Sequence, residues 1–404
     1  MTTKHRVPFG TISIPEESIE MAMAAMKSGR VSSGKLVRQF EKKFAALMGS
    51  RHAVAVSTGT DADILALAVL LYFGASRGDE VIVPALSFAA TGNAVLHAGF
   101  KPVFVDITPH TLGIDAEAIE SAITDRTVAI LPVHLMGKFA DMDRIMAIAK
   151  KHNLKVIEDA AEAHGAFHNG RAAGTIGDLG AFSTYVAHII TTIEGGIVIT
   201  HNPEYAEVLR SLRAHGRACT CEECVLNVKG GYCARRFKNE QQGDIRFLFE
   251  RIGYSAKMNE IEAAVGIGNL NHYDDILGKR RKNLLAFLKA APLFRPYLET
   301  FQEDPDEQIG PHAMPFWVTP EAPFTRNEIV GYLEQNGVET RSLFQSMPTQ
   351  CPGFAFLGYK LGQFPQAEYM GNHGFHLGVH HEMDEADVAH VVEVILGFLK
   401  RCQT

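Results

Sequence analysis

The chain has 404 residues, which is enough for about two domains with a large buried core that needs no disulfides or metals to fold. Hydrophobic residues make up 46% and charged residues 21%, the balance of a soluble globular protein, and the net charge of −7 argues against general nucleic-acid binding. We find no apolar run of signal-peptide or membrane-spanning length, so we expect a cytoplasmic protein without a membrane segment.

Short apolar runs alternate with amphipathic runs from residue 52 onward. Several short runs are β-branched and almost continuously apolar, which is typical of strands buried on both faces of a sheet. Helical patterns lie between them, for example at 62–73 and 141–153. Strands that alternate with helices form βαβ units, so the pattern predicts an α/β fold with a mostly parallel sheet. The predicted strands are 52–57, 80–84, 102–107, 127–134, 154–159, 179–184 and 196–200.

The later part of the chain departs from this alternation. Residues 217–250 are polar, rich in cysteine and contain glycine, which indicates an inserted loop. A long helical pattern at 258–291 leads out of the sheet, and the segments after it are punctuated by proline. We therefore predict a large domain over 1–257, a connecting helical region over 258–291 and a smaller α+β domain over 292–404.

Three segments place polar residues at predicted strand ends. Gly59 lies between a strand and a helix, so amides near Thr60 can hold a phosphate, although an ordinary structural turn explains the segment equally well. Asp159 ends a strand at the edge where parallel sheets bind ligands. It can pair with the pyridinium nitrogen of pyridoxal phosphate or simply cap a helix. Ser183 ends another strand and can donate to a phosphate, and His188, five residues later, taken alone is a hydrogen-bonded loop histidine.

The order and spacing of these segments, together with 84–107, 253–266 and 337–341, resemble the DegT–StrS family of sugar aminotransferases over most of the chain. The resemblance implies a fold-type-I enzyme with a mostly parallel, seven-stranded sheet. It also implies a homodimer whose active sites are built from two subunits. The cofactor would be pyridoxal or pyridoxamine phosphate, and the substrate a nucleotide-linked 4-keto sugar.

The same resemblance implies roles for individual residues. It matches Gly59, Thr60 and Ser183 to phosphate-binding positions and Asp159 to the partner of the pyridinium nitrogen. It matches Phe88 to the aromatic side chain stacked on the cofactor ring and Glu162 to a position near the cofactor hydroxyl. Ser255 matches an asparagine that reaches the neighbouring subunit's cofactor phosphate, and Arg341 matches an arginine near the substrate pocket.

One departure from the aminotransferase pattern concerns the residue that binds the cofactor covalently. His188 stands at the Schiff-base lysine position, and 181–200 contains no lysine. An imidazole cannot form that link but can act as a base near neutral pH. The sequence therefore resembles the histidine-bearing sugar 3-dehydratases, which hold pyridoxamine phosphate non-covalently. That branch has a second histidine next to the first, where this chain has Ile189.

Four cysteines in the 217–250 segment supply enough thiolates for a tetrahedral Zn²⁺ or iron–sulfur site, and the spacing alone does not separate the two. Ascarylose-type dehydratases carry a [2Fe–2S] cluster in a similar insert, which implies an electron relay from a partner reductase. Their remaining ligand has no counterpart at 160–162, so Cys224 would have to replace it. The candidate ligands are Cys219, Cys221, Cys224 and Cys233.

The sequence predicts C3 dehydration and deoxygenation of a nucleotide-linked 4-keto-6-deoxyhexose. The cofactor would be pyridoxamine phosphate, the base His188, and a [2Fe–2S] cluster would relay electrons. One alternative is a colitose-type dehydratase regenerated by glutamate, in which the cysteines bind zinc or nothing. A second is a catalytically silent scaffold or regulator. A third is an aminotransferase whose lysine comes from elsewhere in the chain.

Overall fold

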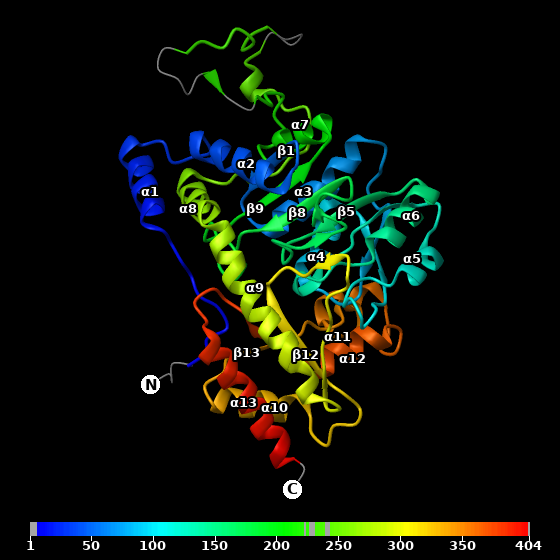
Figure 1. Cartoon of the computed structure of the whole chain (residues 1–404). Helices are drawn as coiled ribbons and strands as arrows, with labels where there is room; N and C mark the ends of the chain where they lie inside the picture. Colours follow the sequence, from blue (N-terminus) through cyan, green and yellow to red (C-terminus); the bar gives the residue numbers. More distant parts are fainter. Residues whose placement is uncertain (1–5, 222–223, 226–230, 239–242, 403–404) are drawn as a thin grey trace.

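The computed structural model describes residues 6–221, 224–225, 231–238 and 243–402. At its centre lies a seven-stranded sheet with the strand order β1-β9-β8-β5-β4-β2-β3 (Figure 1). Every strand predicted from the sequence is present in this sheet. The strands are β1 (His52–Val56), β2 (Glu80–Pro84), β3 (Lys101–Val105), β4 (Thr127–Ile130), β5 (Lys155–Asp159), β8 (Leu179–Ser183) and β9 (Gly196–Thr200).

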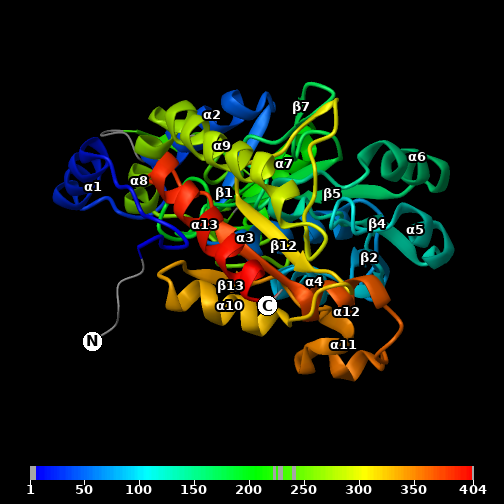
Figure 2. The same cartoon turned by 60° about the horizontal axis from the view of Figure 1, so that its bottom comes forward.

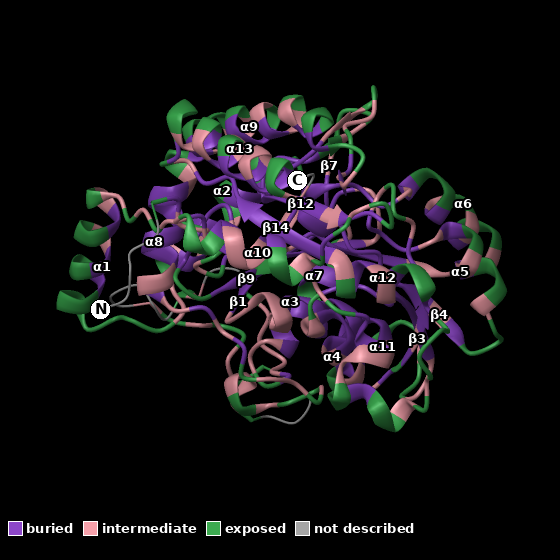
Figure 3. Ribbon diagram, turned by 90° about the horizontal axis from the view of Figure 1, so that it is seen from below, coloured by how far each residue is buried: buried purple, intermediate pink, exposed green. Residues whose placement is uncertain are grey.

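The sheet is mostly parallel, as the βαβ pattern predicts. Strand β9 alone runs antiparallel to its neighbours, β8 and β1. Alternate residues pack into two separate cores: Val54 and Val56 belong to one, and Ala55 to the other. Figure 3 shows buried strands between helices whose outer faces are exposed. Burial on both faces explains why these strands are continuously apolar in sequence.

Helices cover the two faces of the sheet. The N-terminal helices pack on α8, and Glu260 of α8 accepts backbone N–H groups of Gly34, Leu36 and Val37 at 2.9–3.0 Å. That carboxylate therefore caps the start of α2 and joins distant segments. The helices are α1 (Glu16–Ser28), α2 (Lys35–Met48), α3 (Gly59–Val69), α4 (Ala89–Ala98), α5 (Ala116–Ala122), α6 (Met142–His152), α7 (Pro203–Leu212) and α8 (Glu260–Asn271).

The connecting region at 258–291 is helical but forms two helices, α8 and α9 (Tyr273–Ala290). The break falls at His272, whose backbone leaves the helical conformation with ψ of 12°. A capping box between Asn259 and Glu262 fixes the start of α8.

The C-terminal part is built on an antiparallel sheet in the order β10-β12-β14-β13. Helices α10 and α13 pack together beside this sheet, and α9 contacts α13 (Figure 2). A small sheet of β11, β6 and β7 joins the two parts of the chain. The elements are β6 (Phe167–His168), β7 (Arg171–Ala172), β10 (Leu298–Glu299), β11 (Glu307–Gln308), β12 (Ala313–Val318), α10 (Arg326–Gln335), β13 (Thr340–Ser342), α11 (Met347–Gln350), α12 (Pro365–His373), β14 (Gly374–Gly378) and α13 (Glu385–Arg401).

The described parts of 217–250 extend beyond α7, away from the body of the molecule (Figure 1). A short 3₁₀ helix, Ile245–Phe247, lies among them, and most of the other described residues there are in turns or irregular structure. Within the described ranges, no helix has the length and apolar character needed to cross a membrane.

Candidate active site

A cavity of about 550 Å³ lies at the carboxyl edge of the large sheet, where the loops after β1, β2, β4, β5 and β8 converge. Nearly all residues that the sequence assigned to a cofactor or substrate site line it, and side chains from β13 and the start of β12 close it. The predicted residues in its lining are Gly59, Thr60, Phe88, Asp159, Glu162, Ser183, His188 and Arg341.

One end of the cavity is suited to an anion. The first turn of α3 opens there, and the Thr58 side chain caps it by accepting the N–H of Asp61 at 3.0 Å. A Cβ atom on Gly59 would stand 2.6 Å from the Cβ of Ser183, so only glycine lets the helix start approach β8 this closely. The Ser183 hydroxyl accepts the N–H of Tyr185 at 3.2 Å and can donate its own proton. A helix N-terminus beside a hydroxyl donor is a typical phosphate site.

A buried carboxylate occupies the floor of the cavity. Asp159 is 5% exposed, accepts the hydroxyl of Thr91 at 2.8 Å and accepts the N–H of Ala161 at 3.2 Å. Burial raises the pKa of Asp159, and these hydrogen bonds oppose that rise. The buried Asp63 lies nearby, where burial and the charge of Asp159 raise its pKa well above the ordinary value. Such a site favours a cationic ligand group that stabilises the ionised Asp159.

His188 lies in the loop after β8, and its backbone N–H donates to the carbonyl of Tyr185 at 2.9 Å. The ring lines the cavity, while its Nδ1 atom is enclosed and has no hydrogen-bond partner. Burial lowers the pKa of His188 to about 3, with smaller contributions from His164 and Arg280. The imidazole is therefore neutral at physiological pH and available as a proton acceptor.

A second imidazole, which the sequence analysis did not single out, lies beside His188. The ring of His312 is centred 5.3 Å from the ring of His188, and its Nε2 atom stands 3.4 Å from Oε1 of Glu162. Glu162 accepts the N–H of Met136 at 2.7 Å through its other oxygen, and burial raises the pKa of its carboxyl to about 8. No local pattern marks His312, because it lies just before β12 of the four-stranded sheet, while the seven-stranded sheet supplies most of the site.

The mouth of the cavity carries aromatic side chains and one cation. Phe88 is 61% exposed, and its ring centre lies 5.7 Å from that of Phe344. The guanidinium of Arg341 lies 5.0 Å from the ring centre of Phe9 and pairs with Glu339 at 2.6 Å. Tyr185 also lines the mouth, a second residue that the sequence analysis missed.

Two further points concern the position of Ser255 and the residue that could bind a cofactor covalently. Ser255 is exposed, forms an isolated bridge with Ala214 and does not line the cavity, so its role toward a neighbouring subunit stays a prediction. No lysine lines the cavity in the part of the chain that the structure describes. The geometry therefore offers no candidate for a covalent cofactor link there.

The four insert cysteines are free thiols in the structure. Burial raises the pKa of the Cys219 thiol, and the charges of Cys221 and Cys224 add to this rise. Nevertheless, across the described ranges no three His, Cys, Asp or Glu side chains are arranged to hold a metal ion. The thiols as placed do not fit the predicted [2Fe–2S] or zinc site.

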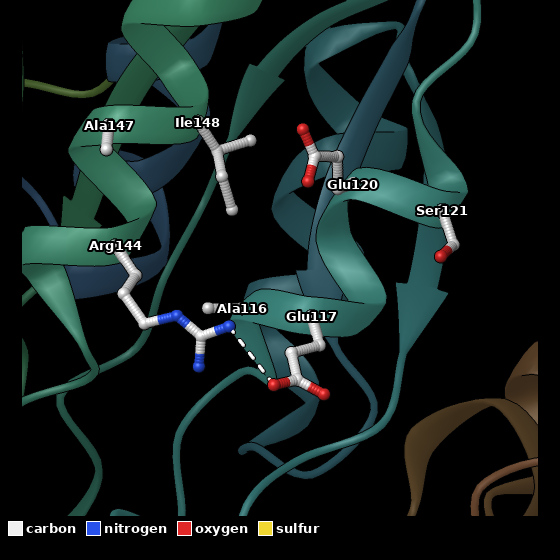
Figure 4. Close-up of a pocket in the computed structure, with 7 residues that line it drawn as sticks. All are labelled: Ala116, Glu117, Glu120, Ser121, Arg144, Ala147 and Ile148. Atoms are coloured by element: carbon white, nitrogen blue, oxygen red, sulfur yellow. Dashed lines mark hydrogen bonds and ion pairs between the residues drawn. The ribbon is translucent and has the colours of Figure 1, made fainter.

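A second hollow of about 440 Å³ lies between α5 and α6 (Figure 4). Its charged side chains are Glu117, Glu120 and Arg144, and Arg144 pairs with Glu117 at 3.3 Å while the two are 52% and 78% exposed. An exposed pair of this kind contributes little, and the hollow gathers none of the residues that the sequence marked for chemistry. The cavity at the sheet edge is therefore the candidate active site.

A mostly parallel sheet whose edge gathers a helix N-terminus, a buried aspartate and an exposed aromatic ring agrees with the fold-type-I pyridoxal-phosphate-dependent enzymes that the sequence resembles. The model of the DegT/DnrJ/EryC1/StrS aminotransferase family matches residues 13–396. The chain belongs to this family.

Relatives with two different activities resemble this chain over nearly its full length. GDP-perosamine synthase of Caulobacter vibrioides is 34% identical, with 90% of each chain covered. GDP-4-keto-6-deoxy-D-mannose 3-dehydratase of Yersinia pseudotuberculosis is 32% identical, with 98% of each covered. The solved Escherichia coli GDP-4-keto-6-deoxy-D-mannose-3-dehydratase with bound hydrated pyridoxal phosphate has a TM-score of 0.85 at 28% identity, covering 97% of this chain and 100% of that one.

Proposed function

We propose that this protein catalyses pyridoxamine-phosphate-dependent C3 dehydration of a nucleotide-linked 4-keto-6-deoxyhexose. The observation that carries the proposal is the cavity lining, which brings together His188, Asp159 and Ser183 while the described lining residues include no lysine. A cofactor amine held without a covalent link, with an imidazole beside it, suits proton transfer during dehydration.

The residues present fit this cofactor. The cradle of Gly59 and Ser183 would bind the phosphate, because an added Cβ atom would fill it. The buried Asp159 would pair with the pyridinium nitrogen, and the exposed ring of Phe88 would cover the cofactor ring. When bound, pyridoxamine phosphate supplies an amine that reacts with a keto group and a ring that withdraws electrons.

The chain's own residues would then divide the remaining work. Neutral His188 takes a proton at the reacting centre, and Asp159 keeps the cofactor ring oriented through its anchored carboxylate. Phe88 and Phe344 restrict access of water at the mouth. Arg341, which pairs with Glu339 and lies over the ring of Phe9, is the candidate for the substrate's diphosphate.

Overall similarity does not choose between the activities of the relatives, because a synthase and a dehydratase are about equally similar to this chain. The residue at position 188 is what favours dehydration. The names of the dehydratase relatives further point to a GDP-linked 4-keto-6-deoxy sugar as the first substrate to test.

The test is incubation of the pyridoxamine-phosphate-loaded protein with GDP- and dTDP-linked 4-keto-6-deoxyhexoses, followed by mass spectrometry of the sugar. We expect loss of the C3 hydroxyl. Parallel reactions contain glutamate, a chemical reductant, or neither. Turnover that requires glutamate supports the colitose-type reaction, and a 3-deoxy product that requires reductant supports the electron relay. Amino transfer without dehydration would contradict the proposal.

The electron relay, its partner reductase and the homodimer stay predictions from the sequence. Metal analysis and the visible spectrum of anaerobically purified protein test the relay directly. Zinc without iron, or no metal at all, would leave the glutamate-regenerated dehydratase. Sedimentation of the purified protein measures the oligomeric state.

A silent scaffold or regulator predicts that the cavity binds no pyridoxamine phosphate. The buried carboxylates Asp159 and Asp63 weigh against it, since enclosing charged groups without a ligand is unfavourable. Equilibrium dialysis with pyridoxamine phosphate measures this binding before any substrate is identified.

A further inference from the structure

Three titratable side chains in the cavity form a row: Glu162, His312 and His188. The Nε2 atom of His312 lies 3.4 Å from Oε1 of Glu162, and its ring is centred 5.3 Å from that of His188. Both histidines have an enclosed Nδ1 atom without a hydrogen-bond partner. Two neighbouring rings, each with an unused nitrogen, can form a hydrogen bond after a modest rotation, and catalytic contacts often tighten only when ligand is bound.

The position of His312 is fixed by its backbone rather than by its side chain. The buried Arg280 of α9 donates to the carbonyl of Pro311 at 3.0 Å and to the carbonyl of His312 at 2.9 Å. The N–H of Gly310 donates to the carbonyl of Gly137 at 2.9 Å, which holds the same loop beside Glu162. A change of the His312 side chain therefore leaves these anchors in place.

The electrostatic surroundings disfavour a charged imidazole. Burial lowers the pKa of His312 well below its ordinary value, and the groups that face it add to this effect. The same holds for His188, whose pKa of about 3 makes it a weak base on its own. The groups packed around His312 are Glu162 after β5, His164, His188 after β8, Arg280 of α9 and His376 of β14.

We propose that Glu162 is the final acceptor of the proton that His188 takes up, and that His312 relays this proton between them. The inference rests on the proposed dehydration and adds two residues to it. It also places an imidazole beside His188, whose neighbour in sequence is Ile189, and this imidazole comes from His312, immediately before β12.

The relay conserves protons: one enters at His188 and one arrives at Glu162. His188 accepts one proton at Nε2 and gives its Nδ1 proton to Nδ1 of His312. His312 then gives its Nε2 proton to the Glu162 carboxylate. No imidazolium forms in the buried site, and the proton rests on the carboxyl whose pKa is about 8. When the C3 hydroxyl leaves, the chain runs in reverse: His188 donates its Nε2 proton to the departing oxygen, water forms and Glu162 returns to the carboxylate.

The first test needs no substrate. Infrared difference spectra should show the carbonyl band of a protonated carboxylic acid appearing as the pH falls through about 8, and Glu162→Gln should remove that band. In ¹⁵N-histidine NMR, His312 should carry its proton on Nδ1 below that pH and on Nε2 above it, because the protonated carboxyl donates to Nε2 and the carboxylate accepts from it. A tautomer that does not change with pH would overturn the relay.

The second test measures the rate. Because the relay needs ionised Glu162, kcat should rise with pH through about 8 in the wild type. Glu162→Gln and His312→Phe should each lower kcat about 10²-fold or more and remove this pH dependence. The double variant should be no slower than either single one, since both interrupt one path. His312→Gln guards against a packing defect and should behave like His312→Phe.

The matched control is Glu80→Gln, a buried glutamate at the start of β2 that pairs with Lys101 away from the cavity. It should keep the wild-type rate and pH profile. Single variants with unchanged kcat, or rate losses that multiply in the double variant, would overturn the relay. Spectra that show the linked titration in a protein without dehydratase activity would instead reject the proposed function and keep the proton path.

Discussion

The cavity and the cysteine-rich insert are the two regions that the sequence marked for chemistry, and they differ in how their residues come together. The cavity residues are spread from Phe9 to His376, yet they meet at one edge of a sheet. The insert cysteines lie within 15 residues of one another but form no metal-binding group in the described ranges.

The difference shows that strand ends position side chains better than proximity in sequence does. In an open parallel sheet, the carboxyl ends of the strands point to one edge whatever the loop lengths. A thiol cluster in a loop has no such scaffold, and its geometry depends on whether a ligand orders it.

His188→Asn removes the base but keeps a side chain of similar size. We expect the dehydration rate to fall about 10²- to 10⁴-fold, the usual contribution of a general base. Binding of pyridoxamine phosphate, measured by equilibrium dialysis, should change little, because the phosphate and ring contacts lie elsewhere. An unchanged rate would show that another group is the base.

Gly59→Ala tests how closely the cavity is packed. The added methyl group would lie 2.6 Å from the Cβ of Ser183, which forces α3 and β8 apart. We expect cofactor affinity to fall at least about tenfold, since overpacking costs roughly 1–3 kcal/mol. The control is Gly278→Ala in α9, where an added Cβ meets no atom within 4 Å. Equal affinities for both variants would contradict the close contact.

Glu260→Gln tests the scaffold that holds the N-terminal helices against the large sheet. The carboxylate accepts three backbone N–H groups at the start of α2, and an amide offers one acceptor oxygen instead of two. We expect the free energy of unfolding, measured with urea, to fall by about 1–3 kcal/mol. Glu393→Gln, at an exposed site on α13, should have almost no effect.

Asp244→Asn in the insert should have the smallest effect. Asp244 pairs with Arg246 at 2.6 Å and with Arg236 at 2.8 Å, and these partners lower the pKa of its carboxyl. Because both arginines are about one-third exposed and solvent screens the two pairs, we expect urea unfolding to detect no clear loss of stability. A loss as large as that of Glu260→Gln would show that the insert is as firmly built as the cavity.

The sequence predicted all seven strands of the large sheet, because most of them are buried and nearly continuously apolar, but it extended β4 to 134 where the strand ends at Ile130. Its resemblance to a known family marked Asp159 and His188 as site residues, and both line the cavity, Asp159 at the end of β5 and His188 in the loop after β8. It did not predict His312 or the anchoring role of Arg280. Both depend on how the C-terminal part of the chain packs against the seven-stranded sheet, and no local periodicity encodes that packing.

The hydrogen bonds from Arg280 to the backbone carbonyls of residues 311 and 312 have a consequence for ligand binding. It ties the long helix α9 to the wall of the cavity, so the C-terminal part cannot loosen without disturbing that wall. By thermodynamic linkage, a ligand that occupies the cavity should protect amide hydrogens of α9 and α13 from exchange, although neither helix contributes a residue to the cavity lining. Ligand binding should therefore increase the stability of the C-terminal part of the chain, which contributes fewer residues to the site than the large sheet does.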